Sequence, residues 1–106
     1  MPNVAIDKDL KSLVQDMGAL MDATPIDDPD YENVKKQYQK ASDLLAKAIE
    51  KAIDEADQDY QDFTKEMKLA IKAIKDVQEK IKKLAEVIVQ VAQVIDIAGK
   101  VVGKLV

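Results

Sequence analysis

The longest regular pattern in the chain is YQDFTKEMKLAIKAIKDVQEKIKKLAEVIVQVAQVIDIAGKVVGKL, residues 60–105. Its apolar residues recur at alternating spacings of three and four, which is the spacing of a heptad repeat. One seam position holds Tyr, Met, Ile, Ile, Ile, Ile and Val, and the other holds Phe, Ala, Val, Leu, Val, Ala and Leu. A seam of this kind predicts a long helix that packs against other helices, so the expected fold class is all-α.

The pattern extends toward the N-terminus as far as Tyr31, but its phase slips between Ala48 and Tyr60, where three successive spacings are of four residues. Neither Gly nor Pro occurs between Pro29 and Gly99, so one continuous helix over residues 29–103 is an open alternative. Acidic residues are densest at 54–59, and Asp57 or Asp59 is a suitable N-cap. We therefore expect a break there, with one helix over about 29–56 and another over about 58–103.

A separate helical pattern occupies about residues 4–23, where apolar residues fall on one stripe. A proline-bounded turn over 24–29 follows, with Asp28 expected as the N-cap and Pro29 as the first residue of the next helix. The stripe consists of Ile6, Leu10, Leu13, Val14, Met17, Leu20 and Met21. The predicted architecture is a single all-helical domain, residues 1–106, arranged as a helical hairpin or three-helix bundle. Its long C-terminal, heptad-patterned helix is expected to pack as in a coiled coil.

The C-terminal stretch, residues 84–106, holds fifteen apolar residues out of 23. Its longest charge-free run, residues 87–95, is only nine long, whereas a membrane-spanning helix needs about 20. Positions beside the seam are also apolar, which predicts a wide apolar face with more than one neighbour. We expect this stretch to exceed what the chain can bury. The expected function is therefore a non-enzymatic assembly protein that binds a second copy or a partner helix through the apolar face of residues 60–105. The expected interface residues are Ile74, Val77, Ile81, Leu84, Ile88, Val91, Ile95 and Val102.

Composition restricts the chemistry that the chain can perform. It has no Cys, His, Trp or Arg, and all 16 basic residues are Lys. There is consequently no thiol nucleophile, no soft metal site and no bidentate phosphate clamp, although catalysis by carboxylates alone stays open. We expect no enzyme activity, no cofactor, no metal site and no small-molecule substrate. Nucleic-acid binding is not expected either, because the net charge is −4 and aromatic residues are few.

Two alternatives to an assembly protein remain at this level: a compact monomer, and a lipid- or membrane-active amphipathic helical protein. The segment Pro25-Ile26-Asp27-Asp28-Pro29 resembles the proline-bounded turn of needle subunits of type III secretion systems, which are small, Cys-free, self-assembling helical hairpins. That resemblance covers five residues, and the helical region after the turn is much longer here. Long helices with apolar ends are also similar in pattern to α-helical pore-forming toxins. The first residues, MPNVAIDKDLKSLV, lack a basic region followed by an apolar core, so a cytoplasmic location is expected, with signal-less export as an alternative.

Overall fold

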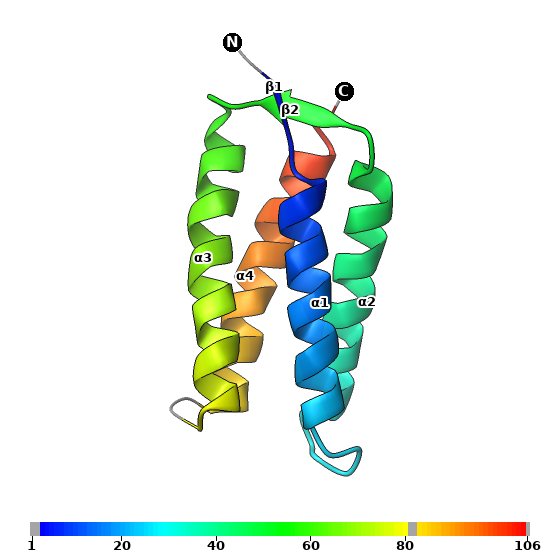
Figure 1. Cartoon of the computed structure of the whole chain (residues 1–106), viewed down its shortest axis with the longest axis vertical. Helices are drawn as coiled ribbons and strands as arrows, with labels where there is room; N and C mark the ends of the chain where they lie inside the picture. The colour runs from blue at the N-terminus through cyan, green and yellow to red at the C-terminus, as the bar shows by residue number, and fades with distance from the viewer. Residues whose placement is uncertain (1–2, 81–82, 106) are drawn as a thin grey trace.

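The computed structural model describes residues 3–80 and 83–105, and within these ranges four helices pack side by side into a bundle (Figure 1). The all-α class predicted from the sequence is confirmed. Two three-residue strands at one end of the bundle accompany the helices. In chain order the elements are β1 Asn3–Ala5, α1 Asp7–Ala23, α2 Tyr31–Ala48, β2 Ala52–Asp54, α3 Gln58–Gln78 and α4 Leu84–Val102.

The bundle consists of two helical hairpins, α1 with α2 and α3 with α4, laid against each other. α1 lies beside α3, and α2 lies beside α4. Between the hairpins the chain crosses the end of the bundle through β2, which pairs antiparallel with β1 and places Val4 opposite Ile53 (Figure 1). This crossover ties the start of the chain to its middle and fixes how the two hairpins are joined.

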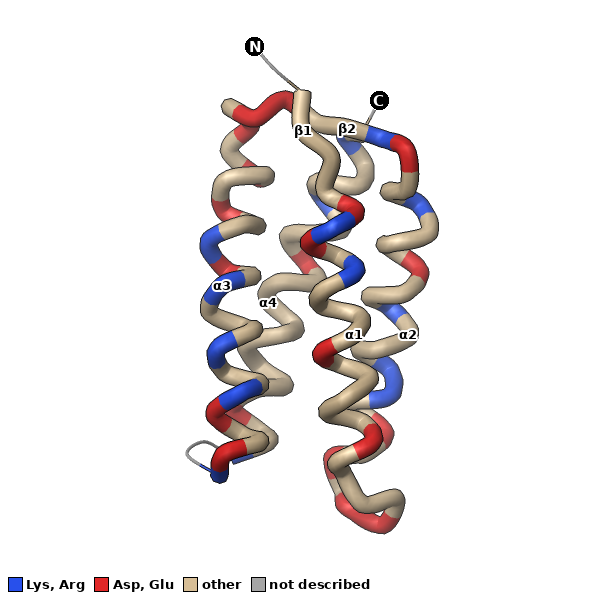
Figure 2. The backbone as a smooth tube through the Cα atoms, viewed as in Figure 1, with Lys and Arg blue, Asp and Glu red and all other residues tan. Residues whose placement is uncertain are grey.

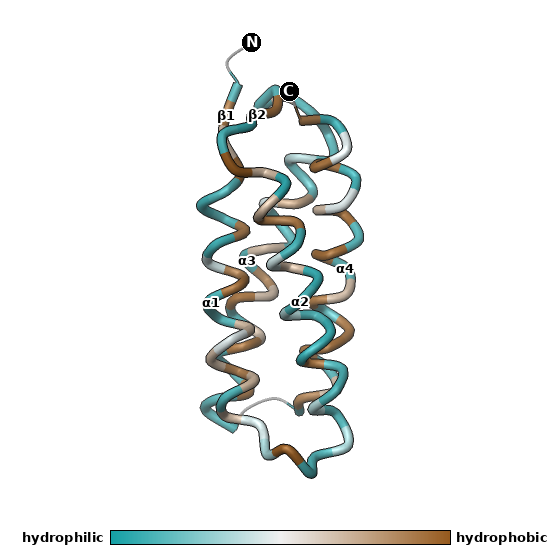
Figure 3. The backbone as a smooth tube through the Cα atoms, turned by 90° about the vertical axis from the view of Figure 1, so that its right-hand side faces the viewer, coloured by the Kyte–Doolittle hydropathy of each residue, from teal (hydrophilic) through white to brown (hydrophobic). Residues whose placement is uncertain are grey.

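One apolar core runs through the bundle and takes residues from every helix. Brown and teal alternate along each helix in Figure 3, as expected where one stripe faces the core and the other faces water. Burying a side chain of this size stabilises the fold by about 1.5–3 kcal/mol each. The largest fully buried side chains are Phe63, Ile6, Leu10, Leu13, Met17, Leu20, Ile74, Val34, Val87, Val91, Val94 and Val101.

The first helix begins later than the pattern predicts. α1 starts at Asp7 rather than at residue 4, because Asn3–Ala5 form β1 against β2. Ile6 between strand and helix is fully buried, so the start of the chain is held by the core as well as by the strand pair.

The second helix is shorter than predicted at both ends. α2 starts at Tyr31 with Asp30 at its N-cap; Asp28 does not cap it but accepts the backbone N–H of Asp30 at 2.8 Å within the turn. The helix ends at Ala48 rather than at residue 56, because Glu50 adopts a left-handed conformation with φ 64° and the chain enters β2. The break expected near 54–59 is confirmed in that α3 starts at Gln58, where Asp57 accepts the N–H of Tyr60 at 3.1 Å.

The continuous helix predicted over 58–103 is wrong, because α3 ends at Gln78 and α4 begins at Leu84. Lys80 is left-handed with φ 62°, a conformation that costs about 1 kcal/mol or more outside Gly. Folding α4 back onto α3 offsets this, since the seams of the two helices then cover each other. Val77 and Leu84 are seven residues apart, so the turn preserves the heptad spacing and leaves no phase slip in the sequence.

Candidate interaction surface

Most of the residues predicted as an interface hold the bundle itself together. Ile74 and Val91 are buried in the core, and the others in the described ranges are partly buried against it: Val77, Leu84, Ile88, Ile95 and Val102. Ile81 lies outside the described residues. The prediction that the C-terminal stretch exceeds what the chain can bury is wrong for residues 84–105, where Val89 is the one exposed large apolar side chain. The physical reason is the turn after α3, which supplies α4 with a neighbour that the continuous-helix prediction did not include.

The outer side of α4 is nevertheless distinctive. Val89 is 61% exposed, and the exposed residues next to it, Ala92 and Gln93, are uncharged. The nearest exposed charges on this helix are Glu86 and Asp96. On α3, by contrast, exposed lysines recur every turn, and charged residues are spaced closely along α3 but sparsely along α4 (Figure 2). An apolar side chain in a charge-free stretch can be covered without removing an ion from water.

A groove of about 270 Å³ lies between α2 and α4 further along α4, at Ile95 and Gly99, where the exposed Asp96 and Lys100 also lie. Leu44 and Ile95, both partly buried, and Gly99 form its apolar lining. Its polar lining comes from α2 and consists of Lys40, Asp43 and Lys47. We call the outer residues Val89, Ala92, Gln93 and Gly99, together with the groove residues Leu44 and Ile95, the α4 face.

In the described ranges, neither packing nor helix capping requires a glycine at position 99, unlike at the other two glycines. At Gly18 a Cβ atom would come within 3.3 Å of Tyr38 Cε2, so the close packing of α1 on α2 favours glycine there. Gly103 stands at the end of α4 as its C-cap. A Cβ at Gly99 would meet nothing within 4 Å, although glycine inside a helix costs about 0.5–1 kcal/mol relative to alanine. Within the described chain, no neighbour requires a glycine at this position.

The buried side chain of Gln37 sets how α2 and α4 are aligned along their axes. Gln37 Nε2 donates to the backbone carbonyl of Ile88 at 2.8 Å, and further along Lys47 and Gly99 line the same groove. A residue of α2 therefore lies level with the residue of α4 that is 51 or 52 positions later. Gln37 Oε1 is buried and has no hydrogen-bond partner among residues 3–80 and 83–105.

Two polar contacts tie α4 to α3. Gln90 Nε2 donates to Glu66 Oε2 at 2.7 Å, midway along the helices. Near the crossover, Lys104 Nζ lies 2.7 Å from Asp59 Oδ2 and 3.1 Å from Asp57 Oδ2. The hydrogen bond from Lys104 lowers the pKa of Asp57, and the hydrogen bonds to Asp59 and Asp57 raise the pKa of Lys104. This ion pair joins the end of the chain to the N-cap of α3.

Perturbed carboxyl groups occur elsewhere, on α1. Burial, followed by the charge of Asp7, raises the pKa of Asp9, and burial raises the pKa of Asp16. Burial also raises the pKa of Tyr60, with the charges of Asp9 and Glu55 adding to it. Neither Asp9 nor Asp16 lines the groove beside α4. Within residues 3–80 and 83–105 no three acidic side chains are grouped so that they could hold a metal ion.

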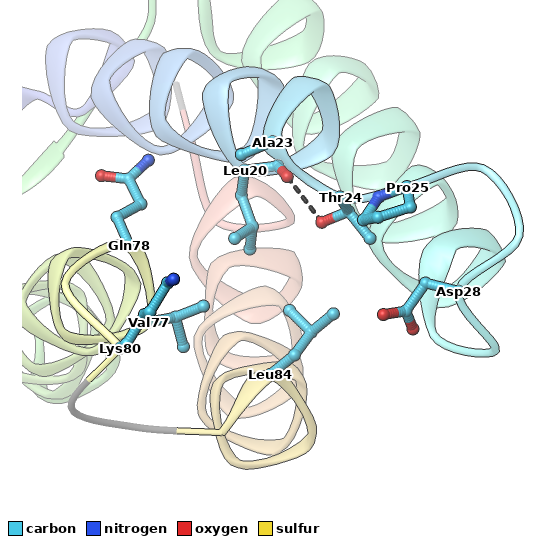
Figure 4. Close-up of a pocket in the computed structure, with 9 residues that line it drawn as sticks. All are labelled: Leu20, Ala23, Thr24, Pro25, Asp28, Val77, Gln78, Lys80 and Leu84. Carbon is cyan, nitrogen blue, oxygen red and sulfur yellow. Dashed lines mark hydrogen bonds between the residues drawn. The ribbon is translucent and has the colours of Figure 1, made fainter.

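A second pocket, of about 280 Å³, lies at the end of the bundle opposite the strands, between the two hairpin turns (Figure 4). Leu20, Val77 and Leu84 point toward one another across it. Thr24 at its edge donates its hydroxyl to the carbonyl of Leu20 at 2.7 Å, and Asp28 accepts the N–H of Asp30. These polar groups are engaged in the turn that ends α1, so they build local structure.

Comparison with known proteins gives no match for this chain among family models, curated proteins or solved structures. In the part of the chain that the structure describes, every helix is too short or too polar to cross a membrane. Sequence reasoning predicted a wide apolar face on this helix. It missed Gly99 and the groove, because the neighbouring α2 residues are 50 positions away in the chain.

Proposed function

We propose that this protein is a non-enzymatic helical assembly module that self-associates through the α4 face. The observation that carries the proposal is Val89, exposed in the charge-free run 87–95 of α4, together with the groove further along the helix at Ile95 and Gly99. Contiguous exposed apolar surface is typical of surfaces that bind protein, whereas single exposed apolar residues are common, so the proposal depends on Val89 and the groove being covered together. Recognition would be of helix against helix, as predicted from the sequence, but through the outer side of α4 rather than through its seam.

The surface is small, and this sets the strength to be expected. Covering Val89 removes one medium-sized apolar side chain from water, with Ala92 and the groove residues Leu44 and Ile95 adding to it. Interfaces of this kind belong with weak and reversible contacts rather than with obligate dimers. The association should therefore depend on protein concentration, and the chain should fold without it.

The absence of Cys and His from the sequence supports a non-enzymatic role. With neither Cys nor His in the sequence, the usual nucleophile–base pairs cannot form. The carboxyl groups with raised pKa, Asp9 and Asp16, stand outside the groove and are explained by partial burial on α1. The polar residues of the groove, two lysines and one aspartate, suit contact with charged side chains of another protein.

A dilution series followed by backbone amide NMR tests the proposal and locates the surface. Amide resonances of Val89, Ala92, Gln93 and Gly99 should shift with concentration, because their surroundings change when the surface is covered. Resonances of Ser12 and Gln15 on α1, exposed on a helix that belongs to the other hairpin, serve as the internal control. Shifts confined to another face, or none up to millimolar concentration, would overturn the proposal.

A further inference from the structure

The pocket at the end of the bundle opposite the strands has an apolar interior built from the ends of three helices. Leu20 comes from α1, Val77 from α3 and Leu84 from α4, and these side chains converge in it (Figure 4). Leu20 is only 2% exposed, so the pocket reaches from the surface to the core. A cavity of about 150 Å³ lined by Leu, Ile and Phe holds benzene. At about 280 Å³, this pocket has room for a larger apolar group.

The charged groups at the rim stand on opposite sides of the pocket. Lys80 lies on the α3 side, and Asp28 lies across from it in the turn between α1 and α2 (Figure 4). Asp28 Oδ1 accepts the N–H of Asp30 at 2.8 Å, and the hydroxyl of Thr24 donates to the carbonyl of Leu20. Both of these groups are therefore engaged in their own turn. The ammonium group of Lys80 can meet an anion without competing with those bonds, since an amine head donates and has no acceptor.

We propose that this pocket binds a single-chain amphiphile, an aliphatic chain that ends in a carboxylate. The chain lies among Leu20, Val77 and Leu84, where it is removed from water, and the carboxylate pairs with Lys80 on the side away from Asp28. A volume of about 280 Å³ suits one short chain, so the expected ligand is a free molecule rather than a lipid in a bilayer. By its described lining residues, the pocket shares nothing with the α4 face, so this proposal is independent of self-association.

Lys80 has a structural counterpart at the other end of the bundle, which provides a matched control. Lys80 follows the C-cap of α3 and has φ 62°, whereas Glu50 follows the C-cap of α2 and has φ 64°. Glycine is favoured at such positions, because it adopts positive φ without strain. The two residues therefore have the same backbone environment, but Lys80 lines the pocket and Glu50 lies near the strands.

Titration with sodium octanoate, followed by methyl NMR, tests the proposal. Methyl resonances of Leu20, Val77 and Leu84 should shift with a Kd of about 1 mM, the strength expected for so small a ligand. The methyl groups of Leu69, which is exposed on α3, serve as the control and should not shift. Octylamine, with the same chain and a cationic head, should bind several-fold more weakly. Butanoate, with the same head and a shorter chain, should also bind several-fold more weakly, because less apolar surface is buried.

Substitutions locate the head and the chain separately. Lys80→Gln should weaken octanoate binding several-fold and remove the preference over octylamine, whereas Lys68→Gln, at an exposed lysine of the same helix, should leave binding unchanged. Lys80→Gly should weaken binding and raise the melting temperature, whereas Glu50→Gly should raise the melting temperature alone. Ala23→Leu should weaken binding, because the larger side chain takes up part of the pocket.

Three results would overturn the proposal. The first is equal affinity for octanoate and octylamine, or octanoate binding that Lys80→Gln leaves unchanged. The second is the absence of methyl shifts up to about ten times the expected Kd, or shifts as large at Leu69 as in the pocket. The third is binding to phosphatidylglycerol vesicles without binding to octanoate, which would show a membrane surface as the partner instead of a free chain. Self-association is judged separately, by the mass of the ligand-free chain in solution.

Discussion

Gln37 reaches from α2 to the backbone carbonyl of Ile88 on α4, and its other amide atom is buried without a partner in the described part of the chain. A buried glutamine that satisfies only part of its hydrogen-bonding capacity is unfavourable compared with an apolar side chain of similar size. What it contributes is alignment, because its one bond sets which residues of α2 and α4 lie level. The groove beside Gly99 depends on that alignment.

Replacing Gln37 tests whether this side chain lowers the free energy of unfolding. Gln37→Leu should stabilise the fold by about 1 kcal/mol, because relief of a buried unpaired oxygen outweighs the loss of one hydrogen bond. The carbonyl of Ile88 retains the backbone ladder of α4 as a source of donors. Gln37→Ala is the control and should destabilise by about 1–2 kcal/mol through the cavity that it leaves. Urea unfolding followed by circular dichroism measures both, and a Leu variant less stable than the wild type would contradict the account.

Two glycines should respond differently to the same substitution. Gly99→Ala should raise the free energy of unfolding by about 0.5–1 kcal/mol, since the added methyl group meets open space and helix propensity improves. Gly18→Ala should gain less or lose stability, because its Cβ would press on Tyr38 at 3.3 Å. The comparison is made by thermal melts at dilution, where association contributes little. Equal gains at both sites would mean that Tyr38 is not packed against α1 as described.

Val89 and Val91 are two residues apart on α4, but Val89 is exposed at the surface and Val91 is buried in the core. Val91→Ala should destabilise the bundle by about 1–3 kcal/mol, because it removes buried methyl groups and leaves a cavity. Val89→Ala should change stability by no more than about 0.5 kcal/mol, since that side chain is exposed. Denaturant midpoints of the two variants give the answer. A large loss at Val89 with a small one at Val91 would show that the helix is rotated.

The stability that the ion pair between Lys104 and Asp57 confers on the fold should depend on pH. The pKa of Asp57 is lowered, so its stabilising contribution is present above the ordinary value of 3.8 and is lost as the pH falls through the lowered pKa. The pKa of Lys104 is raised, so its contribution is present below 10.5 and is lost as the pH rises through the raised value. Asp57→Asn keeps an N-cap residue but removes the charge, so its melting temperature should fall below that of the wild type between these limits.

The difference between this variant and the wild type should shrink in strong acid. Absolute stabilities are less informative, because Asp9 and Asp16 have raised pKa values and their protonation in acid favours folding. Melting temperatures of both proteins from pH 2 to pH 8 give the comparison, since the contributions of Asp9 and Asp16 cancel. A difference that stayed constant across this range would show that Lys104 does not pair with Asp57 in solution.

The helices could be predicted from the sequence where apolar spacing and capping residues agree. The phase slip between Ala48 and Tyr60, together with the capping residue Asp57, indicated the middle break and the start of α3, but it did not indicate that α2 ends as early as Ala48. The break after Gln78 gave no such signal, since Lys80 bends the chain without Gly or Pro and the spacing continues. The pairing of Val4 with Ile53 depends on tertiary contacts and leaves no local pattern.

The candidate surface follows from the same missed break. With α3 and α4 predicted as one helix, the seam residues needed another chain to cover them. Once α3 covers the seam, Val89 on the outer side of α4 is the large apolar side chain of that helix that stays exposed. Its groove contains Leu44 from the other hairpin, which only the packing of the two hairpins brings to Ile95.

Absolute mass in solution, measured by light scattering on a sizing column over a concentration series, tests the central claim of self-association most directly. Self-association predicts a mass that rises with concentration from 11.8 kDa toward twice that value, and a Val89→Asp variant that stays at 11.8 kDa while keeping its helix content. A wild-type chain that remains at 11.8 kDa throughout, up to millimolar concentration, would contradict it.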